Sequence, residues 1–216
     1  MARLLALNSG GIDSPVATHR MLAGGHAVDV VIFDNQPFTD PDDIETAKET
    51  VERLADRHET SITAFIVQHG PVQEQFLDTV PEDELKYLCL FSRRIMLRVS
   101  NEIAANHEYD GLVTGDNIGQ VASQTLDNMV VIDKASERPV YRPLLGCDKD
   151  QISAEARDIG TYDVSIGGGI TCAVNPARPE THARTEELAE VEEKFDIDQI
   201  VAESLESIES VSFDPS

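Results

Sequence analysis

The sequence predicts an α/β fold in which a doubly wound parallel sheet of about five strands carries helices on both faces. Short apolar runs alternate with segments of helical periodicity along the first half of the chain, and this alternation favours a parallel sheet. The first apolar run, residues 4–7, ends in a glycine-bearing turn, and Pro15 stands just inside the helical segment that follows. Proline suits the first turn of a helix, where its missing N–H would have had no intrahelical partner. Asp13 or Ser14 is the expected N-cap of this helix.

The remaining elements follow from the same patterns of apolar residues. Strands are expected at residues 28–33, 61–67 and 112–114, with shorter extended pieces at 130–132 and 140–141. Helices are expected at residues 40–57, 72–80, 85–106 and 148–159. Residues 185–210 are expected to be helical and acidic, with a break near Asp196. A ligand of such a sheet would lie at the carboxyl ends of its strands.

The composition describes an acidic, cysteine-poor chain of ordinary domain size. Its 216 residues include 17 basic and 40 acidic ones, which gives a net charge of −23. A charge of this size, spread along the chain, favours a surface adapted to high salt, as in a halophile, because salt screens the self-repulsion. Any contact with nucleic acid would need a local basic patch. No apolar run approaches the length of a membrane span and no secretion signal opens the chain, so we expect a cytoplasmic protein that does not enter membranes.

The turn after the first strand, residues 9–14, reads Ser-Gly-Gly-Ile-Asp-Ser. A strand-turn-helix junction collects anions because free backbone N–H groups and the positive end of the helix dipole face one point. Gly10 and Gly11 let the backbone approach a phosphate with no Cβ in the way. The spelling resembles the S-G-G-x-D-S loop of the PP-loop ATP pyrophosphatases, which cleave ATP between the α- and β-phosphates. The alternative is an ordinary glycine turn between a strand and a helix.

Several later segments extend the resemblance to one family. Residues 115–125 read GDNIGQVASQT and residues 142–149 read RPLLGCDK, while residues 33–39, 93–98, 156–162 and 192–196 match the same family in order and spacing. Over this length the chain resembles the ThiI family of tRNA 4-thiouridine synthetases. The resemblance implies a PP-loop domain of the adenine nucleotide alpha hydrolase-like fold. We expect that domain over residues 1–180, with residues 181–216 as an acidic helical extension of it.

The resemblance implies an ATP-dependent sulfurtransferase. In this family ATP adenylates O4 of a tRNA uridine and releases pyrophosphate, and a persulfide sulfur then displaces AMP. The implied cofactors are ATP and Mg²⁺, and the implied partners are tRNA and a persulfide donor such as a cysteine desulfurase. The implied catalytic residues are a sulfur-relay thiol, a cation for the developing phosphate charge and a carboxylate that acts on Mg²⁺: Cys172, Lys149 and Asp13. The nucleotide would contact Ser9, Gly10, Gly11, Asp13, Ser14, Phe33, Gly115, Asp116 and Gln120.

The function of the whole protein admits alternatives. Members of the family normally begin with a ferredoxin-like segment and a THUMP domain that bind tRNA, whereas here the first strand starts at Arg3. The sequence therefore predicts an isolated catalytic domain that receives tRNA from a separate tRNA-binding protein, or an adenylate-binding subunit of a THUMP-containing partner. Sulfur transfer for thiamine thiazole biosynthesis is a second role of the family. The sequence is also compatible with a homodimer.

Cysteines and basic residues leave further hypotheses open. Cys89 begins a Cys-Leu-Phe-Ser segment where some family members have C-x-x-C, so an iron–sulfur cluster on Cys89 and Cys172 stays open, although such clusters take three or four thiolates. Cys147 follows an apolar segment and fits the core better. Lys149 stands in the first turn of a predicted helix, where a cation opposes the dipole, which favours a functional reason. The densest basic cluster fits phosphate contacts and salt bridges equally well: Arg93, Arg94 and Arg98.

Overall fold

The protein, a computed structural model, is described over residues 1–167, 173–174 and 176–216. Its sheet has the strand order β5-β4-β1-β2-β3-β6, in which β6 (Glu209–Phe213) is an edge strand. The parallel strands are β1 (Arg3–Leu7), β2 (Ala27–Asp34), β3 (Ile62–Gln68), β4 (Gly111–Val113) and β5 (Val140–Tyr141). This confirms the predicted α/β fold with a central parallel sheet.

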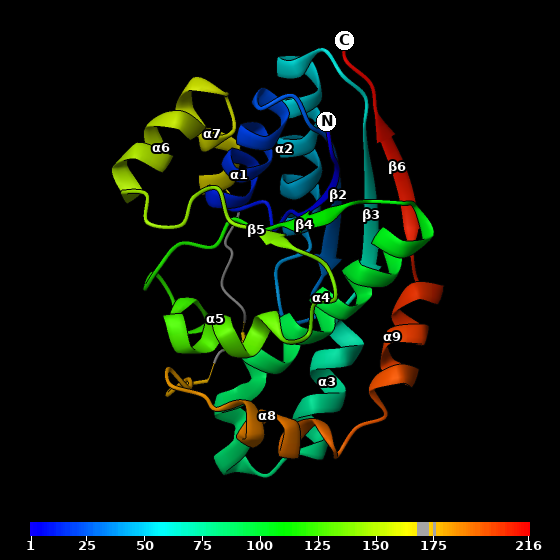
Figure 1. Ribbon diagram of the computed structural model, residues 1–216, viewed down its shortest axis with the longest axis vertical. Coiled ribbons are helices and arrows are strands. Elements are labelled where there is room, and N and C mark those ends of the chain that lie inside the picture. Colours follow the sequence, from blue (N-terminus) through cyan, green and yellow to red (C-terminus); the bar gives the residue numbers. More distant parts are fainter. Residues whose placement is uncertain (168–172, 175) are drawn as a thin grey trace.

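The helices connect the strands and continue beyond them (Figure 1). The first group comprises α1 (Asp13–Ala23), α2 (Asp42–His58), α3 (Gly70–Thr79), a 3₁₀ helix (Glu82–Tyr87) and α4 (Leu88–Asn106). After β4 come a short 3₁₀ turn (Ala122–Gln124), α5 (Leu126–Asp133), α6 (Lys149–Asp158), α7 (Tyr162–Gly167), α8 (Thr185–Glu192) and α9 (Ile197–Glu206). No helix in these ranges is long and apolar enough to cross a membrane.

The side chains of β1 show how the sheet divides the apolar interior into two cores. Leu4 and Ala6 pack on one face with residues of α1, α2 and α6, while Leu5 packs on the other face with residues of α3, α4, α5, α8 and α9. This alternation follows from the two-residue period of a strand. Because both faces are covered, β1 reads as a continuous apolar run, which is typical of a central parallel strand.

Two local predictions are wrong. Residues 130–132 are not extended but lie in α5, whose N-cap Thr125 accepts a hydrogen bond from the Asn128 N–H. The local cap thus outweighs the strand preference of a Val-Val-Ile run. The helix expected to reach residue 210 ends at Glu206, and the chain then forms β6 (Glu209–Phe213), which pairs antiparallel with β3 at the edge of the sheet. The expected break near Asp196 is confirmed, since Asp196 caps α9.

Candidate active site

A cavity of about 220 Å³ opens at the carboxyl ends of the central strands. Its lining includes Leu7 at the end of β1, Phe33 near the end of β2 and Thr114 directly after β4. On one side of β1 lies β2, which follows it by way of α1, and on the other side lies β4. Ligands of doubly wound sheets bind where the strand order reverses in this way. The cavity therefore occupies the place where this fold presents a ligand site.

Asn8 gives the loop between β1 and α1 its shape. Its buried amide donates to the Ala47 carbonyl of α2 at 3.2 Å, and its Oδ1 accepts from the Ser14 hydroxyl at 2.9 Å and the Gly10 N–H at 3.3 Å. Ser14 Oγ in turn accepts from the Ser9 N–H at 3.0 Å. The loop is thus held by its own polar side chains. The expectation that Asp13 or Ser14 caps α1 is wrong, because the N-cap is Ile12 and no side chain bonds the helix end.

Two glycines allow close backbone contacts around this loop. Gly10 has φ +73°, and a Cβ on it would lie 3.0 Å from the Cα and N of Ala47. A Cβ on Gly115, in the segment after β4, would lie 2.8 Å from the N of Ser14. These close contacts surround the N-terminus of α1, which has no side-chain cap. Asp13 and Ser14 line the cavity at this point. Such a terminus binds anions, because its first N–H groups have no intrahelical acceptor and the helix dipole is positive there.

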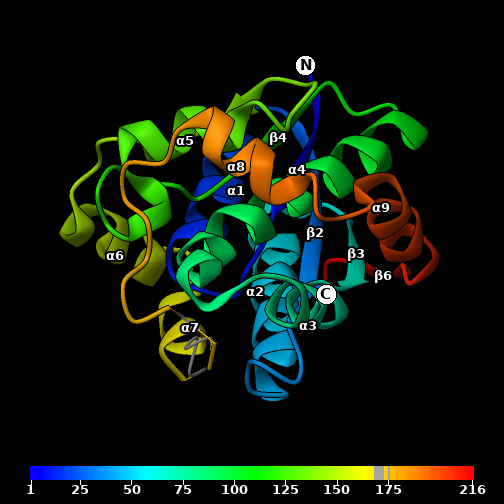
Figure 2. The same cartoon turned by 90° about the horizontal axis from the view of Figure 1, so that it is seen from below.

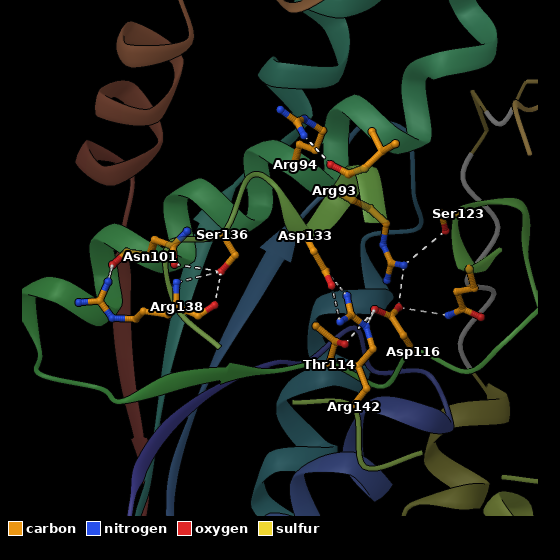
Figure 3. Close-up of polar contacts among 12 residues, drawn as sticks. Arg93, Arg94, Asn101, Thr114, Asp116, Ser123, Asp133, Ser136, Arg138 and Arg142 are labelled. Carbon is orange, nitrogen blue, oxygen red and sulfur yellow. Dashed lines mark hydrogen bonds and ion pairs between the residues drawn. The ribbon is translucent and has the colours of Figure 1, made fainter. Parts of the chain in front are cut away.

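Asp116, directly after Gly115, is the centre of a charged network at the cavity (Figure 3). Its buried carboxylate accepts from Arg93 Nη1 at 2.7 Å, from Arg142 Nε at 3.1 Å and from the Thr114 hydroxyl at 2.8 Å. Burial favours the neutral acid, but Arg93, the Thr114 hydroxyl and Arg142 outweigh it and lower the pKa of Asp116 to about 2. Asp116 is therefore ionised at neutral pH and holds two guanidinium groups beside the cavity.

The three arginines of the basic cluster have different roles. Arg94 and Arg98 both make two hydrogen bonds to the carboxylate of Glu192 on α8, at 2.7 and 2.8 Å for Arg94 and at 2.8 Å for Arg98. These ion pairs hold α8 against α4. Figure 2 shows the two helices from below. Only Arg93 of the three lines the cavity. Salt bridging therefore explains two of them, and Arg93 is left as the candidate phosphate contact.

Lys149 and Asp13 form an ion pair, with Nζ and Oδ1 2.6 Å apart. Lys149 is the first residue of α6 and is half-exposed, while Asp13 lines the cavity. Lys149 is not itself a lining residue, but this contact places its charge next to the loop of residues 9–14. The pairing brings together two of the three predicted catalytic residues.

The wall formed by α4, α5 and the ends of β1 and β2 is apolar. It is made by Leu7, Phe33, Met96, Leu97 and Ile132. Behind it lies His69, whose ring meets that of Phe33 edge-on, with centroids 5.5 Å apart. Complete burial lowers the pKa of His69 to about 3, so the imidazole behind this wall is neutral. An apolar wall and an uncapped helix N-terminus in one cavity suit a ligand with a flat apolar part and an anionic part.

Most of the predicted nucleotide contacts lie at this cavity. Its lining includes Ser9, Asp13, Ser14, Phe33, Gly115 and Asp116. Gly10 and Gly11 shape the loop without lining the cavity, and Gln120 is exposed away from it. From the same sequence block, Gln124 lines the cavity and donates to Asp116 at 3.3 Å. Sequence reasoning did not assign Asn8 and Asp43 to the site, because their positions depend on contacts between distant segments. Arg142, which the sequence offers as an extension of the basic cluster, lines the cavity.

The cysteines do not form a site in the described residues. Cys172 lies outside them, but the next residue, Ala173, donates its N–H to the Phe38 carbonyl at 2.8 Å. Phe38 precedes Thr39, which lines the cavity. Cys147 packs beside the core, and its Sγ accepts from Arg20 at 3.1 Å. Across residues 1–167, 173–174 and 176–216 no group of three His, Cys, Asp or Glu side chains, around Cys89 or elsewhere, could hold a metal ion.

The family model described as "Thiamine biosynthesis protein (ThiI)" matches residues 1–197. This match covers most of the chain. The chain belongs to the ThiI family. It is 39% identical over 208 residues to a probable tRNA sulfurtransferase of Nocardia farcinica, and 38% identical over 213 residues to one of Thermus thermophilus. The alignments cover 95% and 98% of this chain but 50% and 52% of those proteins. The chain therefore spans about half the length of the curated relatives it matches.

A solved structure shows the same architecture. It is a 4-thiouridine synthetase–RNA complex with bound ATP, which matches with a TM-score of 0.91 and 33% identity over 99% of this chain and 55% of that one. An NMN synthetase from Francisella tularensis matches with a TM-score of 0.58 at 17% identity, over 94% of this chain and 81% of that one. At that identity the second match shows the fold alone.

Proposed function

We propose that this protein is an ATP-dependent sulfurtransferase that adenylates O4 of a tRNA uridine and replaces that oxygen by sulfur, releasing AMP and pyrophosphate. The observation that carries the proposal is the meeting of the residue 9–14 loop, the segment after β4 and Arg93 at one cavity. The ThiI-family relatives named as probable tRNA sulfurtransferases support it, as does the solved 4-thiouridine synthetase complex with RNA and ATP.

In this proposal the residues of the cavity divide the work of binding. The apolar wall with Phe33 receives the adenine, and the α1 N-terminus with Ser9 and Ser14 receives the phosphates. Arg93, held by Asp116, and Lys149, held by Asp13, stabilise the charge that develops as the α–β phosphate bond breaks. These groups are fixed by ion pairs within the protein, so little reorganisation is needed during the reaction.

Mg²⁺ fits this cavity as a companion of the phosphates. Mg²⁺ usually keeps several waters and takes one or two carboxylates plus substrate phosphates, and Asp13 offers a carboxylate at the phosphate end of the cavity. When bound, the ion would neutralise phosphate charge. An iron–sulfur cluster does not fit the described residues, because no third candidate ligand accompanies Cys89. We therefore derive no step through a cluster.

The second half of the proposed reaction assigns the sulfur step to Cys172. In the proposal its thiolate has one of two roles. It takes the outer sulfur of the persulfide delivered by a donor such as a cysteine desulfurase and releases the donor thiolate, or it attacks the disulfide formed when that persulfide displaces AMP, which frees the thiolated uridine and leaves a disulfide with the donor. The hydrogen bond from the Ala173 N–H to the Phe38 carbonyl supports this role, because Phe38 directly precedes Thr39, which lines the cavity. A net charge of −23 opposes RNA capture, so a tRNA-binding partner protein belongs to the proposal.

We predict that the protein converts ATP to AMP and pyrophosphate in the presence of tRNA and a sulfur donor, and that the tRNA gains 4-thiouridine. Nucleotide products are separated by chromatography, and tRNA nucleosides are identified by mass spectrometry. In the same assay Cys172→Ala should still release pyrophosphate, the product of the adenylation step, but should form no 4-thiouridine. Cys147→Ala is the matched control and should retain thiolation, since its thiol bonds Arg20 outside the cavity. Release of ADP instead of AMP would contradict the proposed activity.

We further propose that the acidic surface is adapted to high salt. The net charge of −23 makes like charges repel across the folded surface. Raising KCl from about 0.1 M to about 1 M shortens the Debye length from about 10 Å to about 3 Å, so Tm should rise by several degrees. Circular dichroism melts measure this, with sucrose as a control that stabilises without screening. A Tm that stays constant or falls over this range would contradict the proposal.

A further inference from the structure

Asp43 is the residue of the cavity that the proposed function leaves unexplained. It lies in the first turn of α2 and lines the cavity, and it is only 9% exposed. Neither of its carboxyl oxygens has a hydrogen-bond partner within the described part of the protein. A buried carboxyl without a partner is costly, and in folded proteins such groups bond a partner, bind a ligand or become neutral.

The other two carboxylates of the cavity each have a charged partner, so Asp43 differs from them. Asp13 has Lys149 at 2.6 Å, and Asp116 has Arg93 at 2.7 Å and Arg142 at 3.1 Å. The other charged side chains that line the cavity therefore have partners other than Asp43, and none of them neutralises it. The unpaired oxygens of Asp43 are available to a ligand.

The position of Asp43 on α2 places it beside the anion-binding loop. It lies one helical turn before Ala47, and residues four apart share a face of a helix. Ala47 is the residue against which Gly10 packs, since its Cα and N lie 3.0 Å from the Cβ position of that glycine. Ser9, Asp43 and Ala47 all line the cavity. A phosphate held by the loop therefore lies in the same cavity as the Asp43 carboxyl.

The surroundings of Asp43 act on its protonation in both directions. Burial and the nearby charges of Asp40 and Asp42 raise its pKa. The backbone N–H of Asp40 has a smaller, opposite effect, although it makes no hydrogen bond to the carboxyl. The positive end of the α2 dipole favours the ionised form. An incoming phosphate adds negative charge and therefore favours the neutral acid.

We propose that Asp43 contacts the bound nucleotide as a neutral carboxylic acid whose O–H donates a hydrogen bond to a phosphate oxygen. Nucleotide binding then takes up the proton that neutralises this carboxyl. This inference rests on the proposed function, since it needs a nucleotide phosphate in the loop. The carboxyl then acts as a hydrogen-bond donor within the cavity. Above the pKa that it has in the complex, the ionised carboxylate repels the same phosphate, and binding weakens as the pH rises.

The test measures the affinity for α,β-methylene-ATP, which cannot be cleaved at the α–β position, by calorimetry at fixed KCl and excess Mg²⁺. Wild-type protein is compared with Asp43→Asn from about pH 6 to about pH 9, a range in which the ligand's own titration is common to both proteins. Relative to the variant, the wild type should lose about tenfold or more in affinity over this range. Glu45→Gln, which removes an exposed charge of the same helix turn that does not act on the pKa of Asp43, should keep the wild-type profile.

Each other outcome overturns the inference in a recognisable way. Parallel pH profiles for the wild type and Asp43→Asn would show that Asp43 takes up no proton. A variant that binds weakly at every pH would show instead that the carboxylate accepts a hydrogen bond or binds a cation. If α,β-methylene-ATP binds to neither protein, the proposed function fails and this inference fails with it. Thermal melts of each variant check that the protein is folded during these measurements.

Discussion

Gly10→Ala is expected to abolish nucleotide binding. Gly10 has φ +73°, a conformation that costs an L-residue about 1–2 kcal/mol. In addition its new Cβ would lie 3.0 Å from the backbone Cα and N of Ala47, so either the loop or α2 must move. Because the Gly10 N–H and the Ser14 hydroxyl share the same Asn8 acceptor, a shift at residue 10 spreads through the loop. We expect the affinity for ATP to fall by more than tenfold, measured by calorimetry.

Gly25→Ala is the matched control for this substitution. Gly25 also has a positive φ, +81°, but nothing lies within 4 Å of its Cβ position. It should therefore lose about 1–2 kcal/mol of folding free energy, the conformational cost alone, and keep its affinity for ATP. Equal loss of affinity in both variants would mean that general destabilisation, and not the contact with α2, causes the effect.

The sequence predicted those parts of the site that adjoin a strand. The residue 9–14 loop and the segment after β4 stand directly after apolar runs, and Phe33 ends such a run. The carboxyl ends of parallel strands meet at one edge of the sheet. For the same reason the core of the fold could be predicted, since a buried parallel strand is apolar on both faces. These features depend on short stretches of sequence.

The remaining features depend on contacts between distant segments. Arg93 and Arg94 are neighbours of identical type, yet one lines the cavity and the other bonds Glu192, 98 residues along the chain. Only the packing of α8 on α4 separates their roles. Asp43 reads as an acidic residue in a helix start, and its burial depends on how α2 meets the loop. The edge strand β6 was missed because its residues are mostly polar and its pairing partner β3 lies far away in sequence.

The carboxylate of Glu192 is expected to be a major source of stability. It is 10% exposed and bonds two guanidinium groups, those of Arg94 and Arg98. Glu192→Gln would leave two arginine charges in the α4–α8 contact without a counter-charge, and Arg94 is itself only 8% exposed. Breaking a buried ion pair by removing one partner costs about 3–5 kcal/mol. We expect a loss of this size in the free energy of unfolding, measured by urea titration. Glu193→Gln, an exposed neighbour, is the control and should change stability little.

The same carboxylate should make stability depend on pH in the acid range. Burial favours the neutral acid, but the hydrogen bonds and charges of Arg98 and Arg94 outweigh it and lower the pKa of Glu192 from 4.5 to about 2. A group whose pKa is lower in the folded than in the unfolded state stabilises the fold above its unfolded pKa. This contribution is therefore complete above about pH 4.5 and is lost as the pH falls toward about 2. Glu192→Gln should show a smaller loss of stability across this window than Glu193→Gln. If the two variants instead follow the same acid profile, the ion pair with Arg94 and Arg98 does not stabilise the ionised form of Glu192.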